Sequence, residues 1–173
     1  MLNNIYLWTG DGWGKTTSAL GVSLRAIGNG HKVIIIQFMK GWKNTGEYLI
    51  RGRLKPNYNI YQFGRKEFVN LKKPSPKDKE LARKGFEFAK QAVKKKPNLL
   101  ILDEINIAVK IGLLDADEVI KFLDSIPKTT AVYLTGRYAP KKLVDRADYV
   151  TEIKAVKYPA IKKGQKAKKG IDY

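Results

Sequence analysis

A glycine-rich segment near the N-terminus constrains the fold of this chain more than any other feature. It follows a short apolar run, residues 5–8, and precedes a stretch of helical spacing, residues 17–27. Glycines between a strand and a helix let backbone N–H groups turn inward around phosphate oxygens, and the helix N-terminus adds a partial charge of about half an electron. The segment is therefore predicted to bind ATP through Thr9, Gly10, Asp11, Gly12, Trp13, Gly14, Lys15, Thr16 and Thr17.

The segment departs from the common phosphate-loop pattern at its first position. That pattern opens with a glycine and closes with Gly-Lys-Thr or Gly-Lys-Ser. Here Gly14-Lys15-Thr16 closes the loop, but Thr9 stands where the opening glycine is expected. The strand before the loop and the helix after it favour a phosphate loop over the alternative, a glycine-rich turn without function. In such a loop Lys15 supplies a mobile charge for the phosphates, and the Thr16 hydroxyl can ligate Mg²⁺.

Strand and helix signals alternate along the rest of the chain. Apolar runs typical of strands recur at residues 32–38, 59–63, 99–102, 131–134 and 149–153. Helical periodicity separates several of them, between Pro76 and Pro97 and over residues 115–125 and 141–147. This alternation predicts an α/β fold of three layers, P-loop NTPase-like, with a mostly parallel sheet between helices. With neither a repeat nor a linker in the sequence, we expect a single nucleotide-binding domain over residues 1–173.

Charged side chains follow two of the predicted strands. Asp103 and Glu104 come directly after a buried-strand run. Carboxylates at that end of a strand lie beside the phosphate loop in this fold class, so with Thr16 they are predicted to hold Mg²⁺ or its waters. Arg137 follows the next run and is predicted to neutralise charge on a phosphate leaving group. The predicted catalytic residues are thus Lys15, Thr16 and Arg137, and the alternatives are solvated carboxylates and a surface arginine.

Composition narrows the classes of function. The formal net charge of +18 predicts attraction to an anion, whether nucleotide, nucleic acid or acidic small molecule, and a solvated lysine coat is the alternative. The lysines are densest at residues 162–169. The absence of cysteine excludes disulfides, thiol catalysis and Cys-ligated metals. Because the sequence has no secretory signal and no apolar run of about 20 residues, we expect a cytoplasmic protein without a membrane partner.

Several motifs, in order along the chain, resemble those of the P-loop ATP:corrinoid adenosyltransferases. The phosphate loop is similar to that family's loop, in which a threonine also precedes the glycines. The other motifs are Gln37-Phe38-Met39-Lys40-Gly41 with Gly46-Glu47, Leu102-Asp103-Glu104-Ile105-Asn106, Leu134-Thr135-Gly136-Arg137 with Ala139-Pro140, Val156-Lys157-Tyr158-Pro159, and Ala167-Lys168-Lys169-Gly170-Ile171-Asp172-Tyr173. The ordered set spans nearly the whole chain and is more specific than any one motif.

The resemblance implies transfer of the 5′-deoxyadenosyl group of ATP to the cobalt of a corrinoid, in adenosylcobalamin biosynthesis or salvage. Cobalt, reduced to Co(I) by an electron donor, attacks C5′ of the ribose, and triphosphate leaves intact. Co(I) is a strong nucleophile, which fits the shortage of acid–base residues. ATP and a corrinoid are then the substrates, Mg²⁺ is the cofactor and a homodimer is expected. The corrinoid contacts implied are Phe38, Lys40, Gly41, Glu47, Phe68 and Asn106.

The chain departs from the family pattern at three places. In the phosphate loop, Trp13 replaces a lysine and Asp11 replaces an asparagine. Tyr158 stands where the family often has histidine. Residues 64–70 keep one aromatic side chain, Phe68, where the family often adds a tryptophan. Phe68 is therefore the candidate that this loop offers for displacing the lower ligand of cobalt.

Two other functions compete with the transferase. A small P-loop ATPase acting on nucleic acid would fit the positive charge, and it predicts hydrolysis stimulated by DNA or RNA with a steep salt dependence. No basic strand studded with aromatic residues suggests a platform for stacking bases, so nucleic acid is not the expected partner. A regulatory module that binds ATP without turnover is the third hypothesis.

Overall fold

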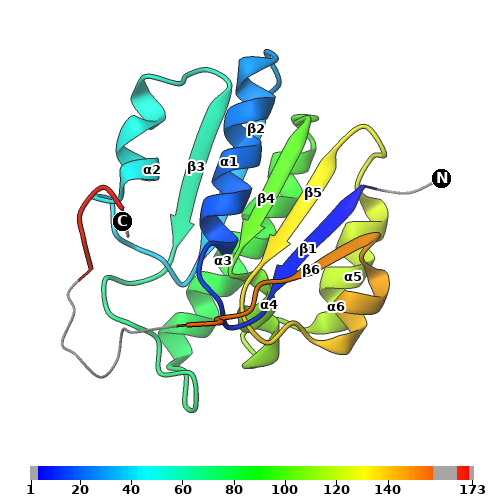
Figure 1. Cartoon of the computed structure of the whole chain (residues 1–173). Helices are drawn as coiled ribbons and strands as arrows, with labels where there is room; N and C mark the ends of the chain where they lie inside the picture. The colour runs from blue at the N-terminus through cyan, green and yellow to red at the C-terminus, as the bar shows by residue number, and fades with distance from the viewer. Residues whose placement is uncertain (1–3, 158–166, 172–173) are drawn as a thin grey trace.

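The computed structural model describes residues 4–157 and 167–171, and within them the chain forms one six-stranded sheet (Figure 1). The strand order is β3-β2-β4-β5-β1-β6, and every pairing in it is parallel. The strands are β1 (Ile5–Thr9), β2 (Val33–Phe38), β3 (Tyr58–Phe63), β4 (Leu99–Asp103), β5 (Ala131–Thr135) and β6 (Tyr149–Glu152). The α/β prediction is therefore confirmed. Tyr158 and the lysines at residues 162–166 lie outside the described residues.

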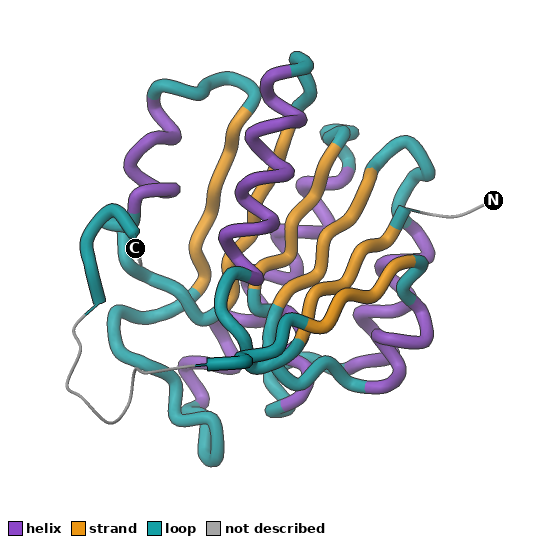
Figure 2. The backbone as a smooth tube through the Cα atoms, in the orientation of Figure 1, coloured by secondary structure: helices purple, strands orange, loops and turns teal. Residues whose placement is uncertain are grey.

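Helices cover both faces of the sheet and make three layers (Figure 2). One layer holds α1 (Lys15–Gly28) with the short α2 (Gly46–Leu49) and the 3₁₀ turn η1 (Ile50–Gly52). The other holds α3 (Pro76–Val93), α4 (Ile105–Lys110), α5 (Ala116–Ser125) and α6 (Lys141–Arg146). Two apolar clusters separate the sheet from these layers, a small one under α1 and a larger one under the four helices opposite. Alternate residues of the central strands face the two clusters, which explains why β2 and β4 are buried along their whole length.

The sequence predicts most of these elements within one or two residues, but it misses two helices. The helix predicted to begin at residue 17 begins at Lys15, directly after the left-handed Gly14. α2 lies in the polar stretch after β2 and has only four residues. In α4, Ile105, Asn106, Ile107, Ala108 and Val109 are all buried, so there is no polar face to mark a helix in the sequence.

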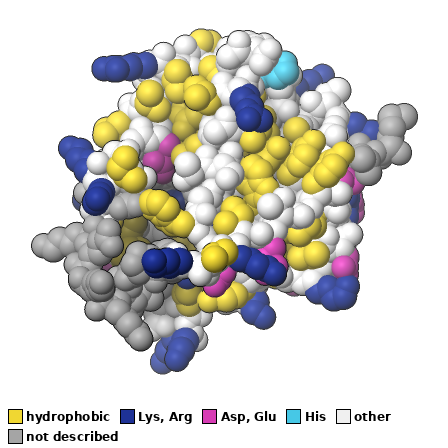
Figure 3. Space-filling model, in the orientation of Figure 1, with side chains coloured by type: hydrophobic (Ala, Val, Ile, Leu, Met, Phe, Trp, Pro, Cys, Tyr) yellow, Lys and Arg dark blue, Asp and Glu magenta, His cyan; other side chains and the backbone are white. Residues whose placement is uncertain are grey.

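The face that carries α1 is only partly covered. On β5, β1 and β6, the rings of Tyr133, Tyr6 and Tyr149 stack in a row, with centroids 4.5 and 4.7 Å apart. Their register on the three strands places them directly opposite one another. Figure 3 shows hydrophobic side chains gathered beside α1 on this face, and Tyr149 is about half exposed. The stacked tyrosines cover this part of the sheet in place of a second helix.

Helix α3 is fixed at its N-terminus by a capping box. Ser75 caps the helix by accepting the N–H of Asp78, and Asp78 accepts the N–H of Ser75 in return. Arg65, in the loop after β3, donates to both carboxylate oxygens of Asp78, at 2.9 and 3.3 Å. This hydrogen bond lowers the pKa of Asp78 to about 2. The buried carboxylate of Asp78 therefore joins the start of α3 to the loop that carries Phe68.

Asp78→Asn is expected to lower the free energy of unfolding near neutral pH by on the order of 1 kcal/mol, because it removes the ion pair and weakens the cap. Since the pKa of Asp78 is depressed, the wild-type advantage is present above the ordinary aspartate pKa and disappears as pH falls from about 4 towards 2. Urea unfolding of wild type and Asp78→Asn at neutral pH and at about pH 2 measures this difference in stability. Asp145→Asn, which removes an exposed pair with Lys141, is the control. Equal stability of Asp78→Asn and wild type at neutral pH would contradict the expectation.

Candidate nucleotide-binding site

The first turn of α1 meets the end of β4 at the carboxyl edge of the sheet. The Thr16 hydroxyl donates to Asp103 Oδ1 at 2.8 Å. β5 lies between β1 and β4, and from its end the Thr135 hydroxyl donates to the same Oδ1 at 2.7 Å. Thr135 in turn accepts the backbone N–H of Glu104 at 3.1 Å. The structure thus brings together the phosphate loop and the acidic pair that the sequence singles out.

The second oxygen of Asp103 is bound from β2. Lys40 Nζ lies 2.7 Å from Asp103 Oδ2, and the Gln37 amide nitrogen donates to that oxygen at 3.0 Å. Asp103 is only 1% exposed. Burial alone would raise the pKa of this carboxyl, but the Lys40 charge and the hydrogen bonds from Lys40, Thr135 and Thr16 outweigh it and lower the pKa. Asp103 therefore stays ionised inside the protein.

Glu104 adds a second acidic group in an unusual backbone conformation. Its φ of 65° lies in the left-handed region, which is uncommon for a residue with a side chain and is found most often where a site constrains the chain. Burial and the neighbouring Asp103 charge raise the pKa of Glu104. The positive charges of Lys40, Lys15 and Arg137 oppose that rise, so the charges of four neighbouring groups act on Glu104.

Lys15 and the phosphate loop lie against neighbouring backbone. Lys15 Nζ donates to the Gly12 carbonyl at 2.5 Å, and burial together with the Arg137 charge lowers the pKa of Lys15. The Gly12 N–H donates to the carbonyl of Ile153, just after β6, at 2.8 Å. Asp11 accepts the N–H of Ala155 at 3.3 Å. One of the amides expected to face phosphate is therefore engaged by the segment that leaves β6.

Close approach of this segment explains two of the loop's glycines. A Cβ on Gly10 would lie 2.3 Å from the Ile153 carbonyl oxygen, and Gly10 also has a φ of 96°. A Cβ on Gly12 would lie 2.7 Å from the same oxygen. Gly14 has a φ of 105° and open space around it, so its role is to turn the backbone into α1.

The residues at this edge fit a magnesium ion held with a nucleotide. Mg²⁺ prefers oxygen ligands, and in nucleotide sites it takes one or two protein groups and completes its shell with phosphate and water. Thr16 Oγ1 and the Asp103 carboxylate, hydrogen-bonded to each other, supply such groups. Within residues 4–157 and 167–171 there is no group of three His, Cys, Asp or Glu side chains that could hold a metal by itself. Thr16 and Asp103 therefore fit a metal ion that is bound partly by ATP.

Comparison with known proteins decides the family. The family model for the ATP:corrinoid adenosyltransferase BtuR/CobO/CobP matches residues 3–173. This chain belongs to that family. The corrinoid adenosyltransferase of Sinorhizobium sp is 36% identical over 95% of this chain and 78% of its own. The corrinoid adenosyltransferase of Pseudomonas aeruginosa is 36% identical over 95% and 81%, and that of Escherichia coli K12 is 34% identical over 98% and 85%.

Among solved structures, domain III of the Thermotoga maritima replication initiation protein DnaA aligns with a TM-score of 0.46. The identity is 16%, over 88% of this chain and 55% of that chain. No helix in the described part of the chain is both long and apolar enough to cross a membrane.

Two of the predicted corrinoid contacts, Phe38 and Asn106, have buried side chains. Phe38 is 0% exposed, because it is the last residue of β2 and faces the larger apolar cluster. Asn106 is also 0% exposed, and its side-chain nitrogen donates to the carbonyls of Trp8 and Gly136, each at 3.1 Å. Neither side chain offers a surface to a ligand. Asn106 instead joins the end of β1 to the loop that carries Arg137.

The other predicted contacts lie near the site in different ways. Lys40 turns towards Asp103, and Gly41 is pressed against the backbone of Arg65, whose carbonyl oxygen would lie 2.6 Å from an added Cβ. Glu47 Oε1 accepts from the Gln37 amide at 3.3 Å. Arg137 is exposed at the end of β5.

Phe68 is 84% exposed and has an aromatic partner that the sequence analysis missed. Trp42 meets the Phe68 ring edge-on, with centroids 4.8 Å apart and planes at 80°. The Trp42 indole N–H donates to the Lys66 carbonyl at 2.5 Å, which ties the two loops together. The tryptophan absent from residues 64–70 is thus supplied by the segment after β2.

Gln37 and Thr135 are the polar residues of the site that sequence reasoning passed over. Both are completely buried, and both belong to the motifs quoted for the resemblance. The usable signal is a polar side chain at the carboxyl end of an otherwise apolar strand, because such a group needs a buried partner.

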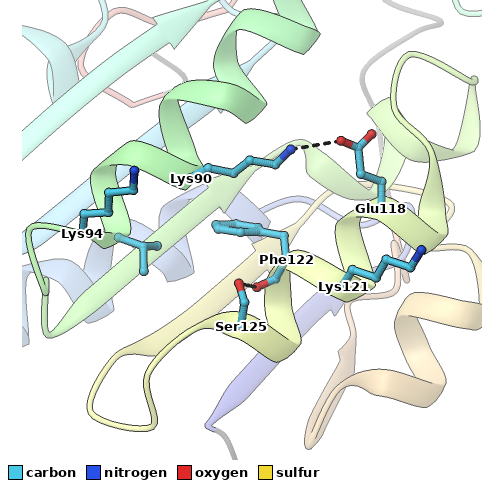
Figure 4. A pocket seen from close by; sticks show the side chains of 7 residues that line it. Lys90, Lys94, Glu118, Lys121, Phe122 and Ser125 are labelled. Carbon is cyan, nitrogen blue, oxygen red and sulfur yellow. Dashed lines mark hydrogen bonds and ion pairs between the residues drawn. The ribbon is translucent and has the colours of Figure 1, made fainter.

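A shallow groove on the opposite layer lies outside this site. It runs between α3 and α5, where Lys90 pairs with Glu118 at 3.0 Å and Lys94, Lys121 and Phe122 complete its walls (Figure 4). None of the residues that line it belongs to the Asp103 cluster or the phosphate loop.

Gly10→Ala is expected to destabilise the protein by at least about 2 kcal/mol, because the new methyl group meets the Ile153 carbonyl and the left-handed backbone disfavours a side chain. Gly21→Ala is the matched control, since its position in α1 is exposed and open, and the exchange should stabilise by up to about 1 kcal/mol. Thermal unfolding compares the two. A Gly10→Ala protein as stable as wild type would show that the loop does not lie against residue 153.

Proposed function

We propose that this chain moves the 5′-deoxyadenosyl group of ATP to the Co(I) centre of a corrinoid and releases triphosphate, in adenosylcobalamin biosynthesis or salvage. The observation that carries the proposal is the hydrogen bond between Thr16 and Asp103, 2.8 Å long, beside Lys15 at the end of the phosphate loop. Membership of the ATP:corrinoid adenosyltransferase family supplies the second substrate. The fold supplies positioning and charge, and the nucleophile comes with the corrinoid.

The transfer step balances without a protein acid or base. The cobalt electron pair forms the Co–C5′ bond and cobalt becomes formally Co(III), while the C5′–O bond breaks and its electron pair leaves with triphosphate. The work of the protein is to bind the polyphosphate and to stabilise its growing charge. We assign that role to Lys15, to Arg137 and to the backbone of the phosphate loop. Mg²⁺ held at Thr16 and Asp103, with Glu104 nearby, would neutralise phosphate charge.

On the corrinoid side, we propose that Phe68 and Trp42 contact the second substrate. The exposed edge-on pair, on loops fixed to each other by the Trp42–Lys66 hydrogen bond, supports this assignment. Large aromatic faces suit the flat apolar surface of a macrocycle. Gly41, next to Trp42, and Glu47, in α2, remain in the proposal, whereas the buried Phe38 and Asn106 are not part of it.

The remaining features of the proposal concern the surroundings of the reaction. An electron donor belongs to the proposal, because the attacking cobalt is Co(I). ATP as co-substrate supports a cytoplasmic location. The stacked tyrosines on the open face support a homodimer, and the single sheet supports one domain over residues 1–173. Lysines and arginines are scattered over the face in Figure 3, which favours a solvated coat over a nucleic-acid stripe.

Lys15→Ala should abolish adenosyl transfer, because it removes the ammonium group nearest the phosphates. Wild-type protein with ATP, Mg²⁺ and a chemically reduced corrinoid should yield a light-sensitive alkylated corrinoid and one triphosphate per turnover, followed by absorbance and by ³¹P NMR. Lys110→Ala, an exposed lysine at the end of α4, is the control and should behave as wild type. Release of phosphate or diphosphate in place of triphosphate would contradict the proposal.

A further inference from the structure

Lys40 lies at a cation position although it belongs neither to the phosphate loop nor to β4. Its Nζ is 2.7 Å from Asp103 Oδ2 and 3.2 Å from Thr16 Oγ1. These are the same two side chains that fit a magnesium ion. The sequence resemblance placed Lys40 on the corrinoid, so its position calls for a different role.

The backbone around Lys40 is built to hold it there. Met39 has a φ of 58°, and this left-handed turn redirects the chain at the end of β2. A Cβ on Gly64 would lie 2.2 Å from the Met39 carbonyl carbon, and one on Gly41 would lie 2.6 Å from the Arg65 carbonyl oxygen. Residues 39–41 are thus pressed against residues 64–65 without room for adjustment. Lys40 is therefore not a surface lysine that happens to reach a carboxylate.

The hydrogen bonds show what Lys40 does to Thr16. The Thr16 hydroxyl proton is committed to Asp103 Oδ1, so the contact with Lys40 uses an oxygen lone pair of Thr16. A metal ion would also bind Thr16 Oγ1 through a lone pair, and the hydroxyl oxygen has only two. An ammonium group and a divalent cation also repel each other at such a distance. The two cations consequently compete for one position.

The charge of Asp103 explains why a cation is needed there even without metal. A carboxylate that is 1% exposed is costly to keep ionised unless a positive group pairs with it. The Lys40 ammonium group lies 2.7 Å from Asp103 Oδ2 and supplies that positive group.

We propose that Lys40 is a positioning residue whose ammonium group fills the cation position between Thr16 and Asp103 in the nucleotide-free protein and yields it to the divalent cation that arrives with ATP. The polyphosphate brings four negative charges at most, which give the displaced ammonium group new partners. This inference rests on the proposed function only in assuming the metal site. It makes binding of the metal and of the nucleotide interdependent.

The test is a titration with Mn²⁺, followed by the electron paramagnetic resonance signal of the free ion, on the full chain without corrinoid. Without nucleotide, Lys40→Met and Lys40→Gln should each bind Mn²⁺ about tenfold more tightly than wild type, because a competing charge is gone. Lys40→Gln retains a donor for Asp103, so it decides the question if Lys40→Met fails to fold. Lys43→Met, an exposed lysine of the same segment, is the control and should match wild type.

Lys40→Gln that is folded by circular dichroism but binds Mn²⁺ no more tightly than wild type would overturn the proposal. So would an equal gain in Lys43→Met, since that would reflect net charge alone. Failure of every protein, the Lys40 variants included, to bind Mn²⁺ would overturn the metal site together with the Lys40 proposal. A missing adenosyl transfer alongside the expected Mn²⁺ pattern would instead overturn the proposed reaction alone.

Discussion

The side chains at the carboxyl edge of the sheet are held together by one buried carboxylate, that of Asp103. Asp103 accepts hydrogen bonds from Thr16 on α1, Thr135 on β5, and Gln37 and Lys40 at the end of β2. Four donors, one of them the Lys40 cation, keep the Asp103 carboxylate ionised in a place where water hardly reaches it. Because all the strands are parallel, their carboxyl ends lie at the same edge of the sheet. The Asp103 carboxylate there joins α1, β2 and β5, which are far apart in the sequence.

The phosphate loop is constrained by the segment that follows β6. The segment after β6 approaches so closely that Gly10 and Gly12 have no room for a side chain. The same segment occupies the Gly12 amide, and Lys15 occupies the Gly12 carbonyl. In the proposed function, binding of phosphate would exchange these internal bonds for bonds to the ligand, and the bonds of Lys40 beside Thr16 would be exchanged in the same way.

Local pattern predicts the fold well where elements have two distinct faces or a long apolar run. The strands at β2 and β4 and the helix α1 follow from such patterns. α4 does not, because residues 105–109 are buried on every side, and α2 is too short for periodicity to register. The order of the strands in the sheet is set by contacts between segments far apart in the chain, which no local pattern contains.

The candidate site also has some residues that the sequence predicts and others that it does not. Thr16, Lys15 and Asp103 follow from motif and position, because a phosphate loop and a strand end must meet in a parallel sheet. Motifs do not say which way each side chain points. The sequence alone therefore does not show that Phe38 and Asn106 lie inside the protein. Trp42 was missed for a related reason, since it reaches Phe68 from another loop.

The most direct measurement is a crystal structure of the full chain with Mg²⁺ and a non-transferable ATP analogue. The account predicts the polyphosphate on residues 10–16, with the Gly12 amide released from Ile153 and the Lys15 ammonium group released from the Gly12 carbonyl. It also predicts the metal at Thr16 Oγ1. An analogue bound elsewhere, or bound with both internal bonds intact, would contradict it.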